Sequence, residues 1–238
     1  MTRVAVIGAK GRMGSVTCEA VAADPELELV AEVDLGDPLS EVVDRGADVA
    51  VEFSTPDSVA RNAAWLLERG VHVVVGATGL SADDLTALEQ RTGPAHCLVA
   101  PNFSIGAVLM MRLAEQVAPH LPDVEIIEEH HPGKADAPSG TALRTAELIA
   151  AARGAAPQVP GPEGEPSRGR RAGDVPVHAV RLPGVLANQT VRFGAAGQTL
   201  TIRHETVDRT AFMPGVLLAV KRIARTPGLT VGLDALLD

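Results

Sequence analysis

Short apolar runs alternate with segments of helical periodicity along the chain up to about residue 103. The candidate strands read RVAVIGA, LELVAEVD, ADVAVEFS, VHVVVGATG and HCLVAPNF. The segments TPDSVARNAAWLLERG and SADDLTALEQRTG carry helix signals, with proline or serine near the start and glycine at the end. This alternation predicts a parallel sheet, and the near-continuous apolar strands predict helices on both of its faces.

The pattern changes after Asn102. Helices are predicted over IGAVLMMRLAEQVAPHL and SGTALRTAELIAAARG, with the strand VEIIEEH between them. The strands VPVHAVRL, ANQTVRF and QTLTIRHET follow, joined by tight turns. We therefore expect a Rossmann-type α/β domain at 1–103 and a smaller α+β domain at 104–212, whose sheet is mixed and largely antiparallel. A C-terminal helix, 213–238, is expected to pack back on the first domain.

Residues 155–174 are rich in proline, glycine and arginine and show no apolar periodicity. A loop of about 20 residues in a compact domain is usually functional or mobile. A plain surface excursion is the alternative. Our hypothesis is that this loop lies at a contact between subunits.

Composition narrows the class of protein. The chain has 238 residues, of which 46% are hydrophobic and 21% charged, as is typical of globular domains. A net charge of -9, one Trp and no Tyr argue against nucleic-acid binding. Apolar runs fall short of the ~18 residues that a membrane span needs, and a cytoplasmic location is expected. Cys18 and Cys97 have no metal-site spacing, so buried thiols and no metal are expected.

The stretch VAVIGAKGRMG places Gly8, Gly11 and Gly14 between the first strand and the next helix. Glycine permits the tight turn and the close approach of a pyrophosphate, which the helix N-terminus then attracts. A glycine turn without a nucleotide is the alternative. Asp34, at the end of the second strand, can accept hydrogen bonds from a ribose and repels a 2′-phosphate. We therefore predict NADH as the preferred cofactor, with NADPH tolerated because Lys10 and Arg12 supply positive charge.

Residues at the ends of later strands are also expected to border the nicotinamide, because ligands of open α/β sheets bind outside the carboxyl ends of the strands. The residues are Gly76, Ala77 and Thr78, then Ala100, Pro101, Asn102 and Phe103.

The stretch EEHHPGKADAPSGTA gathers proton donors and anion-binding groups in the second domain. Pro132 and Gly133 end the strand directly after His130 and His131, so both rings can turn to one cleft. Ser139 is a candidate N-cap, and Gly140 and Thr141 open the next helix, whose free amides suit a carboxylate. Lys134 adds a charged donor, and histidine exchanges protons near neutral pH. Adjacent histidines with only a structural role are the alternative.

The chain contains the segments VAVIGAKGRMG, GATGL, APNFSIGA and above all EEHHPGKADAPSGTA. In these segments it closely resembles the 4-hydroxy-tetrahydrodipicolinate reductase family of diaminopimelate and lysine biosynthesis. The ending RTAFMPGVLLAVKRIARTPGLTVGLDALLD also resembles the actinobacterial branch of this family. The resemblance covers essentially the whole chain. It implies NADH- or NADPH-dependent reduction of a cyclic dicarboxylate to tetrahydrodipicolinate with loss of water. It also implies a homotetramer assembled through the sheets of the substrate domains.

The resemblance implies a role for each matching residue. His130 and Lys134 would be catalytic, as groups that transfer protons, and His131, Ser139, Gly140 and Thr141 would bind the substrate. The implied cofactor contacts in the glycine turn are Gly8, Ala9, Lys10, Gly11, Arg12 and Met13.

The chain departs from the family pattern at Ala77, which lacks the usual hydroxyl, and at Glu129, where a neutral residue is frequent. The charge of Glu129 is expected to raise the pKa of a neighbouring histidine if the two approach within ~4–6 Å. Two other functions stay open on the residues alone. One is a dehydrogenase of another amino-acid pathway, and the other is a non-catalytic dinucleotide sensor, in which proton donors would have no use.

Overall fold

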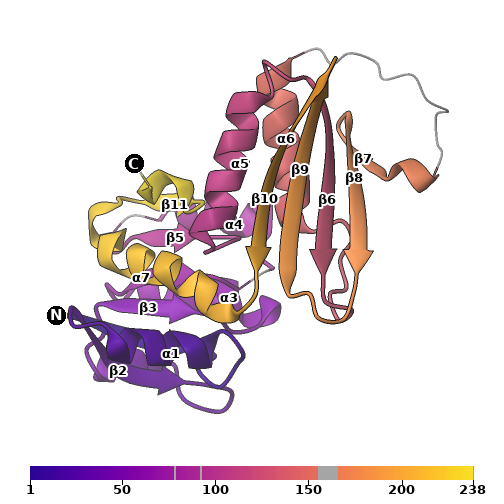
Figure 1. Cartoon of the computed structure of the whole chain (residues 1–238). Helices are drawn as coiled ribbons and strands as arrows, with labels where there is room; N and C mark the ends of the chain where they lie inside the picture. The colour runs from indigo at the N-terminus through magenta and orange to yellow at the C-terminus, as the bar shows by residue number, and fades with distance from the viewer. Residues whose placement is uncertain (78, 92, 155–165, 238) are drawn as a thin grey trace. The chain divides into compact units, whose positions relative to one another are not determined.

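The computed structural model describes residues 1–77, 79–91, 93–154 and 166–237. Contacts within the chain divide it into two compact units. Unit 1 comprises Met1–Ile105 and Arg209–Asp238, and unit 2 comprises Gly106–Asp208 (Figure 1). Unit 1 is therefore built from segments at both ends of the chain.

Unit 1 contains a six-stranded sheet in the order β11-β5-β4-β3-β1-β2. All of its strand pairs are parallel, which confirms the predicted Rossmann-type sheet. Its strands are β1 (Thr2–Ile7), β2 (Leu27–Val33), β3 (Val49–Glu52), β4 (His72–Val75), β5 (Cys97–Val99) and β11 (Leu229–Val231). Its helices are α1 (Gly14–Ala23), α2 (Ser40–Asp44), α3 (Pro56–Leu67), α4 (Ala82–Glu89) and α7 (Met213–Arg222), with short 3-10 turns η2 (Arg209–Phe212), η3 (Ile223–Arg225) and η4 (Asp234–Leu236).

Helices cover the sheet of unit 1 on both faces, as the apolar strands predicted. Val42 of α2, Leu66 of α3 and Leu88 of α4 share one core cluster with the sheet. Cys18 of α1 packs on the opposite side with Val6 of β1. Every residue of β3 is buried, so this strand lies at the centre of the layers.

The two cysteines, Cys18 and Cys97, are buried free thiols, which confirms that prediction. Burial raises the pKa of the Cys18 thiol to about 11 and that of the Cys97 thiol to about 12. Both side chains therefore stay protonated and apolar at neutral pH.

The C-terminal segment differs from the predicted helix over 213–238. Helix α7 ends at Arg222, η3 ends at Arg225, and β11 then pairs in parallel with β5. Gly228 adopts a φ of 72°, which a continuing helix does not permit. The segment LTV that follows is only three residues long and is β-branched in part. The free edge of β5 supplies its hydrogen-bond partners.

Unit 2 contains a five-stranded sheet in the order β10-β9-β6-β8-β7. Only β6 and β8 pair in parallel, so the sheet is mixed and largely antiparallel, as predicted. Its strands are β6 (Asp123–His130), β7 (Arg170–Ala172), β8 (Val175–Arg181), β9 (Ala187–Ala195) and β10 (Gln198–Thr206). Its helices are α5 (Ile105–Val117), which begins on the last residue of unit 1, and α6 (Gly140–Arg153), with the 3-10 turn η1 (Pro166–Arg168).

Helices α5 and α6 pack on one face of this sheet (Figure 1). Met110 of α5, Ile149 of α6, Ile126 of β6 and Phe193 of β9 belong to one buried cluster. Side chains alternate along a strand, so Ile126 and Glu128 of β6 point to the helices while Ile127 and Glu129 point to the other face.

The predicted loop over 155–174 is partly wrong. Residues 155–165 lie outside the described part of the chain, but β7 falls inside the predicted loop and pairs with β8 in antiparallel fashion. The residues RRA of β7 carry no apolar alternation. Their strand conformation depends on hydrogen bonds to β8, which periodicity in the sequence does not reveal.

In the described residues, no helix is both long enough and apolar enough to cross a membrane.

We expect the free energy of unfolding to fall as the pH drops below about 6.5. His72 at the start of β4 accepts a hydrogen bond on Nδ1 from the amide of His96 over 3.0 Å. Burial is the main cause that holds the pKa of His72 below its ordinary value, and the nearby ring of His96 is the second cause. Burial is also the main cause that lowers the pKa of His130 and of His204. As the pH falls, these histidines therefore bind protons in the unfolded chain before they do so in the folded protein. Their contribution to the free energy of unfolding is present above the unfolded pKa and is lost as the pH falls through the folded pKa.

Thermal unfolding between about pH 8 and about pH 5 measures this dependence. His72→Gln should flatten part of the slope, whereas His120→Gln, at an exposed position, should leave the slope unchanged. An identical slope for His72→Gln and the unsubstituted protein would contradict the prediction.

Candidate active site

The turn after β1 is shaped by its glycines. Gly8 has a φ of 76°, and its amide donates to the carbonyl of Val33 over 2.8 Å. A Cβ atom on Gly8 would lie 2.6 Å from the carbonyl oxygen of Phe53, and one on Gly14 would lie 2.0 Å from that of Gly8. Helix α1 then begins at Gly14 with no side-chain cap and no acidic residue in its first turn. The close backbone packing and the uncapped helix start suit a phosphate group.

Asp34 lies directly after β2 and contacts the glycine turn. Its Oδ2 accepts a hydrogen bond from the amide of Lys10 over 2.6 Å, and its Oδ1 accepts one from the amide of Leu35 over 2.7 Å. Hydrogen bonds from the amides of Leu35 and Lys10 hold the pKa of Asp34 below its ordinary value. The carboxylate is therefore charged and fixed beside the turn, while the side chains of Lys10 and Arg12 are exposed.

The ends of β3, β4 and β5 come together at the carboxyl edge of the sheet. The amides of Gly76 and Ala77 donate to the carbonyl of Glu52 over 3.0 and 3.1 Å. A Cβ atom on Gly76 would lie 2.2 Å from the ring of Phe53 and 2.6 Å from the ring of Phe103. These rings meet edge to face at 5.9 Å between centroids. Phe53 was not among the predicted residues, although its place after a buried strand was a usable signal.

The remaining predicted cofactor residues differ in burial and in hydrogen bonding. Ala9, Ala100 and Phe103 are buried, so their side chains contribute to packing. The amide of Ala100 donates to the carbonyl of Val75 over 2.9 Å, and Oδ1 of Asn102 accepts from the amide of Ser104 over 2.8 Å. The other positions are Gly11 and Pro101, which are exposed, Met13, which directly precedes α1, and Thr78, which lies outside the described residues.

In unit 2, β6 ends at His130, whose side chain is 14% exposed. Nδ1 of His130 lies 2.6 Å from Oε2 of Glu128, two residues earlier on the same face of the strand. Burial holds the pKa of His130 below its ordinary value, and the carboxylate of Glu128 acts in the opposite direction. An imidazole ring can both donate and accept a proton, so His130 is a candidate for proton transfer.

The turn after β6 carries His131 and Lys134. The amide of Lys134 donates to the carbonyl of His131 over 3.1 Å, which closes the turn. Nζ of Lys134 lies 2.7 Å from Oδ1 of Asp136. The positive charge of Lys134 also acts on His130, where it lowers the pKa. The structure thus places Lys134 within electrostatic reach of His130.

Helix α6 begins as the sequence predicted. Ser139 is the N-cap, and its side chain accepts a hydrogen bond from the amide of Ala142 over 3.2 Å. A Cβ atom on Gly140 would meet nothing within 4 Å, and the first turn, which includes Thr141, has no acidic residue. The start of a helix attracts negative charge, and with no acidic residue beside it this turn can bind an anion.

Two functional candidates in unit 2 were missed in the sequence. Glu128 hydrogen-bonds to His130, and Arg181 at the end of β8 donates to both carboxylate oxygens of Glu128. The two-residue spacing of Glu128 and His130 on a strand was a signal for the first. No local signal existed for Arg181, because it lies 53 residues away and reaches the site through the pairing of β6 with β8.

The expectation that Glu129 would raise the pKa of a histidine is not supported at His130. Oε2 of Glu129 instead lies 2.8 Å from Nη2 of Arg203, on the opposite side of the strand from Glu128. The carboxylate that acts on His130 is that of Glu128.

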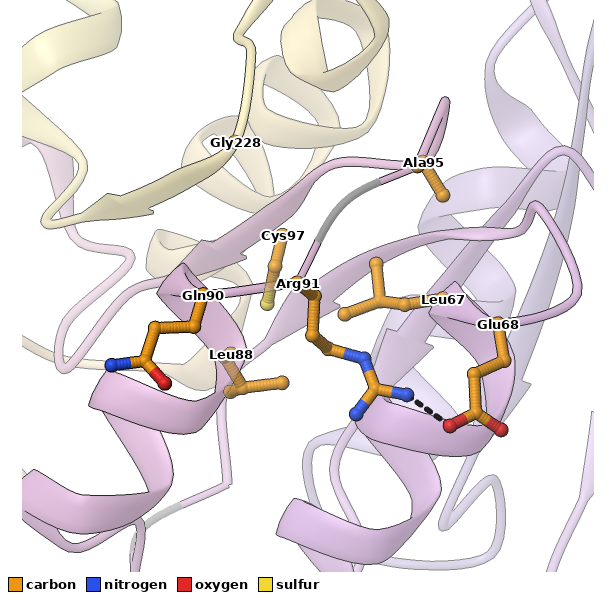
Figure 2. Close-up of a pocket in the computed structure, with 9 residues that line it drawn as sticks. Leu67, Glu68, Leu88, Gln90, Arg91, Ala95, Cys97 and Gly228 are labelled. Atoms are coloured by element: carbon orange, nitrogen blue, oxygen red, sulfur yellow. Dashed lines mark hydrogen bonds and ion pairs between the residues drawn. The ribbon is translucent and has the colours of Figure 1, made fainter.

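A separate cavity of about 250 Å³ lies in unit 1 (Figure 2). Its wall includes Cys97, the first residue of β5, and an ion pair between Arg91 and Glu68. It therefore lies at the amino edge of the parallel sheet, whereas the glycine turn lies at the carboxyl edge, where cofactors bind.

Comparison with protein families matches both parts of the chain. Residues 2–103 match the model described as dihydrodipicolinate reductase, N-terminus, and residues 106–237 match dihydrodipicolinate reductase, C-terminus. The chain is 51% identical to the 4-hydroxy-tetrahydrodipicolinate reductase of Nocardia farcinica, with 99% of this chain and 98% of the relative covered. It is 50% identical to that of Streptomyces avermitilis, with the same coverage.

Comparison with solved structures also finds a dihydrodipicolinate reductase. The dipicolinate-bound dihydrodipicolinate reductase from Paenisporosarcina sp. TG-14 is 37% identical, with a TM-score of 0.85 and full coverage of both chains (100% each). GenD2 from gentamicin A biosynthesis, in complex with NAD, is 16% identical with a TM-score of 0.61, covering 99% of this chain and 90% of that one. The second similarity concerns the fold alone.

Proposed function

The chain belongs to the dihydrodipicolinate reductase family, and we propose how its residues share the NAD(P)H-dependent reduction of 4-hydroxy-tetrahydrodipicolinate. This reaction gives tetrahydrodipicolinate and water in diaminopimelate and lysine biosynthesis. The observation that carries our assignment is the carboxylate of Glu128, which joins His130 to the amide of Ser139 at the start of α6. A proton-exchanging ring and an anion-binding helix start thus belong to one hydrogen-bonded cluster.

The reaction consumes one proton for each hydride, because the hydroxyl group of the substrate leaves as water. Nicotinamide, when bound, supplies the hydride. In our proposal Nε2 of His130 carries the exchanged proton, and Lys134 is a second proton donor that also engages the substrate. His131 and the helix start formed by Ser139, Gly140 and Thr141 bind the two substrate carboxylates. Support for a dicarboxylate ligand comes from the dipicolinate that the relative from Paenisporosarcina holds.

A coupled assay tests this function. The unstable substrate is generated from pyruvate and aspartate semialdehyde, and the loss of NADH absorbance is followed. Folded protein that binds the cofactor but leaves the absorbance unchanged would contradict the proposal. Faster turnover of another 2-oxo or semialdehyde acid would instead favour a dehydrogenase of a different pathway.

We propose that the cofactor is NADH by preference and that NADPH is tolerated. The glycine turn fits a dinucleotide, since it leads into the start of α1, which has no side-chain cap and no acidic residue in its first turn. Asp34 carries the selectivity, because its charged carboxylate is fixed beside the amide of Lys10 and repels a 2′-phosphate. Lys10 and Arg12 offset part of this repulsion.

Asp34→Asn is expected to move the ratio of specificity constants toward NADPH by about fivefold. Two like charges ~4 Å apart in water repel by ~1 kcal/mol, which corresponds to that factor. Initial rates with NADH and NADPH, at fixed substrate, measure the ratio. Asp44→Asn, an exposed change in α2, serves as the control. A higher specificity constant for NADPH in the unsubstituted protein would defeat the proposal.

We propose that the protein is a homotetramer assembled through the sheet of unit 2. The face that α5 and α6 leave uncovered carries Ile127 and Val180, each 36% exposed, among charged side chains. Light scattering should give the mass of a tetramer, and Ile127→Glu should reduce it. Leu113→Glu on α5, which is equally apolar and 49% exposed, should leave the mass unchanged. A monomeric unsubstituted protein would refute this assembly.

A further inference from the structure

Glu128 is a fully buried carboxylate with four hydrogen-bond donors around it. Its side chain is 0% exposed. Oε1 accepts from the amide of Ser139 over 3.0 Å and from Nη2 of Arg181 over 3.0 Å. Oε2 lies 2.6 Å from Nδ1 of His130 and accepts from Nη1 of Arg181 over 2.8 Å. One side chain therefore links the strand of the histidine, the start of α6 and the end of β8.

The charge of Glu128 decides which nitrogen of His130 carries the proton. Burial works to raise the pKa of Glu128, but hydrogen bonds from Arg181 and His130 hold it below its ordinary value. An ionised carboxylate only accepts hydrogen bonds, so Nδ1 of His130 must be the donor. The neutral ring then has its proton on Nδ1, and Nε2 is the nitrogen left to exchange a proton.

We propose that Glu128 is the positioning residue of His130, which fixes the Nδ1–H tautomer and the ring orientation and ties both to the carboxylate-binding start of α6. This inference rests on the proposed role of His130 in proton transfer. Glu128 does not touch the substrate in this assignment. It acts through His130 and Ser139, with Arg181 as the counter-ion that keeps its buried charge balanced.

Glu128 also stabilises the charged, imidazolium form of His130. Burial, the Nζ of Lys134 and the guanidinium of Arg181 all disfavour an imidazolium at this position, and Glu128 opposes them. Asp136 pairs with Lys134 and its carbonyl accepts from Arg181, so it moderates both cations. Loss of the Glu128 charge should lower the pKa of His130 further. As the pH rises, the ring would then lose its donated proton at a lower pH than in the unsubstituted protein.

Glu128→Gln is the first test. We expect the turnover number to fall by at least ~10-fold, with complete loss of a positioned proton donor (~10²- to 10⁴-fold) as the upper limit, and the alkaline limb of the pH–rate profile to move to lower pH. Glu128→Asp keeps the charge and should restore the position of the limb in part. Glu129→Gln is the matched control, because the adjacent carboxylate pairs with Arg203 on the opposite side of the strand. Light scattering checks that each variant keeps the same oligomeric state.

A measurement on the unsubstituted protein decides the matter even if Glu128→Gln does not fold. ¹⁵N-labelled histidine NMR reports the tautomer of His130, whose signal is identified by its loss in His130→Gln. We expect the proton on Nδ1. A proton on Nε2, or a folded Glu128→Gln with the same turnover and the same alkaline limb, would overturn the inference. If His130→Gln itself keeps normal turnover, it is the proposed function of His130 that fails, whatever the tautomer.

Discussion

His130→Gln lowers the turnover number by roughly 10²- to 10⁴-fold in our expectation, the range that a positioned acid or base contributes. Glutamine can still hydrogen-bond to Glu128, but its amide cannot exchange a proton near neutral pH. Binding of the substrate carboxylates at the start of α6 should change much less, because Ser139 keeps its hydrogen bonds to Glu128 and Ala142. Initial rates over a range of substrate concentrations separate the two effects.

Variants at the neighbouring positions give the contrast. Lys134→Ala should also lower turnover strongly, whereas His131→Gln and Thr141→Ala should mainly raise the Michaelis constant, since they remove binding rather than proton transfer. Circular dichroism checks the fold of each variant. Normal turnover in both histidine variants would show that the roles of the pair are wrongly assigned.

Gly14→Ala is expected to impair both the stability of the protein and its binding of NADH. Its Cβ atom would lie 2.0 Å from the carbonyl oxygen of Gly8 and 2.8 Å from the Cα of Ala9, and both are backbone atoms that cannot rotate away. The turn must shift, so we expect a loss of ~1–3 kcal/mol in the free energy of unfolding, as overpacked sites show. Binding of the pyrophosphate should weaken as a result, and the dissociation constant of NADH should rise at least ~10-fold. A loss of ~1.4 kcal/mol in binding free energy suffices for that factor.

Calorimetric titration with NADH and thermal unfolding measure these two losses separately. Gly194→Ala is the control, because a Cβ atom there would meet nothing within 4 Å. Unchanged NADH affinity and unchanged stability in Gly14→Ala would show that the glycine turn does not need its close packing.

The sequence predicted those parts of the fold that local patterns encode. The apolar runs gave the parallel sheet of unit 1, and the segment SGTALRTAELIAAARG gave α6 with its N-cap at Ser139. The short strands β7 and β11 were missed, because each depends on a partner strand rather than on its own periodicity. Pairing between distant segments is a tertiary property that a local pattern does not contain.

The candidate site divides in the same way. The stretch from His130 to Thr141 is contiguous, so its donors could be found together in the sequence. Arg181 could not, because only the register of β6 against β8 brings it to Glu128. Glu129 was given the role that belongs to Glu128, although strand alternation places adjacent side chains on opposite faces.

The origin of unit 1 from both ends of the chain affects how the protein is made. A ribosome releases the first 105 residues long before residues 209–238. Until then the sheet lacks β11 along β5 and lacks the buried residues Val216, Ala219 and Val220 of α7. Unit 2 is complete in sequence before the last segment emerges. The apolar sheet of unit 1 therefore stays incomplete, and open to contact with other chains, until residues 209–238 emerge.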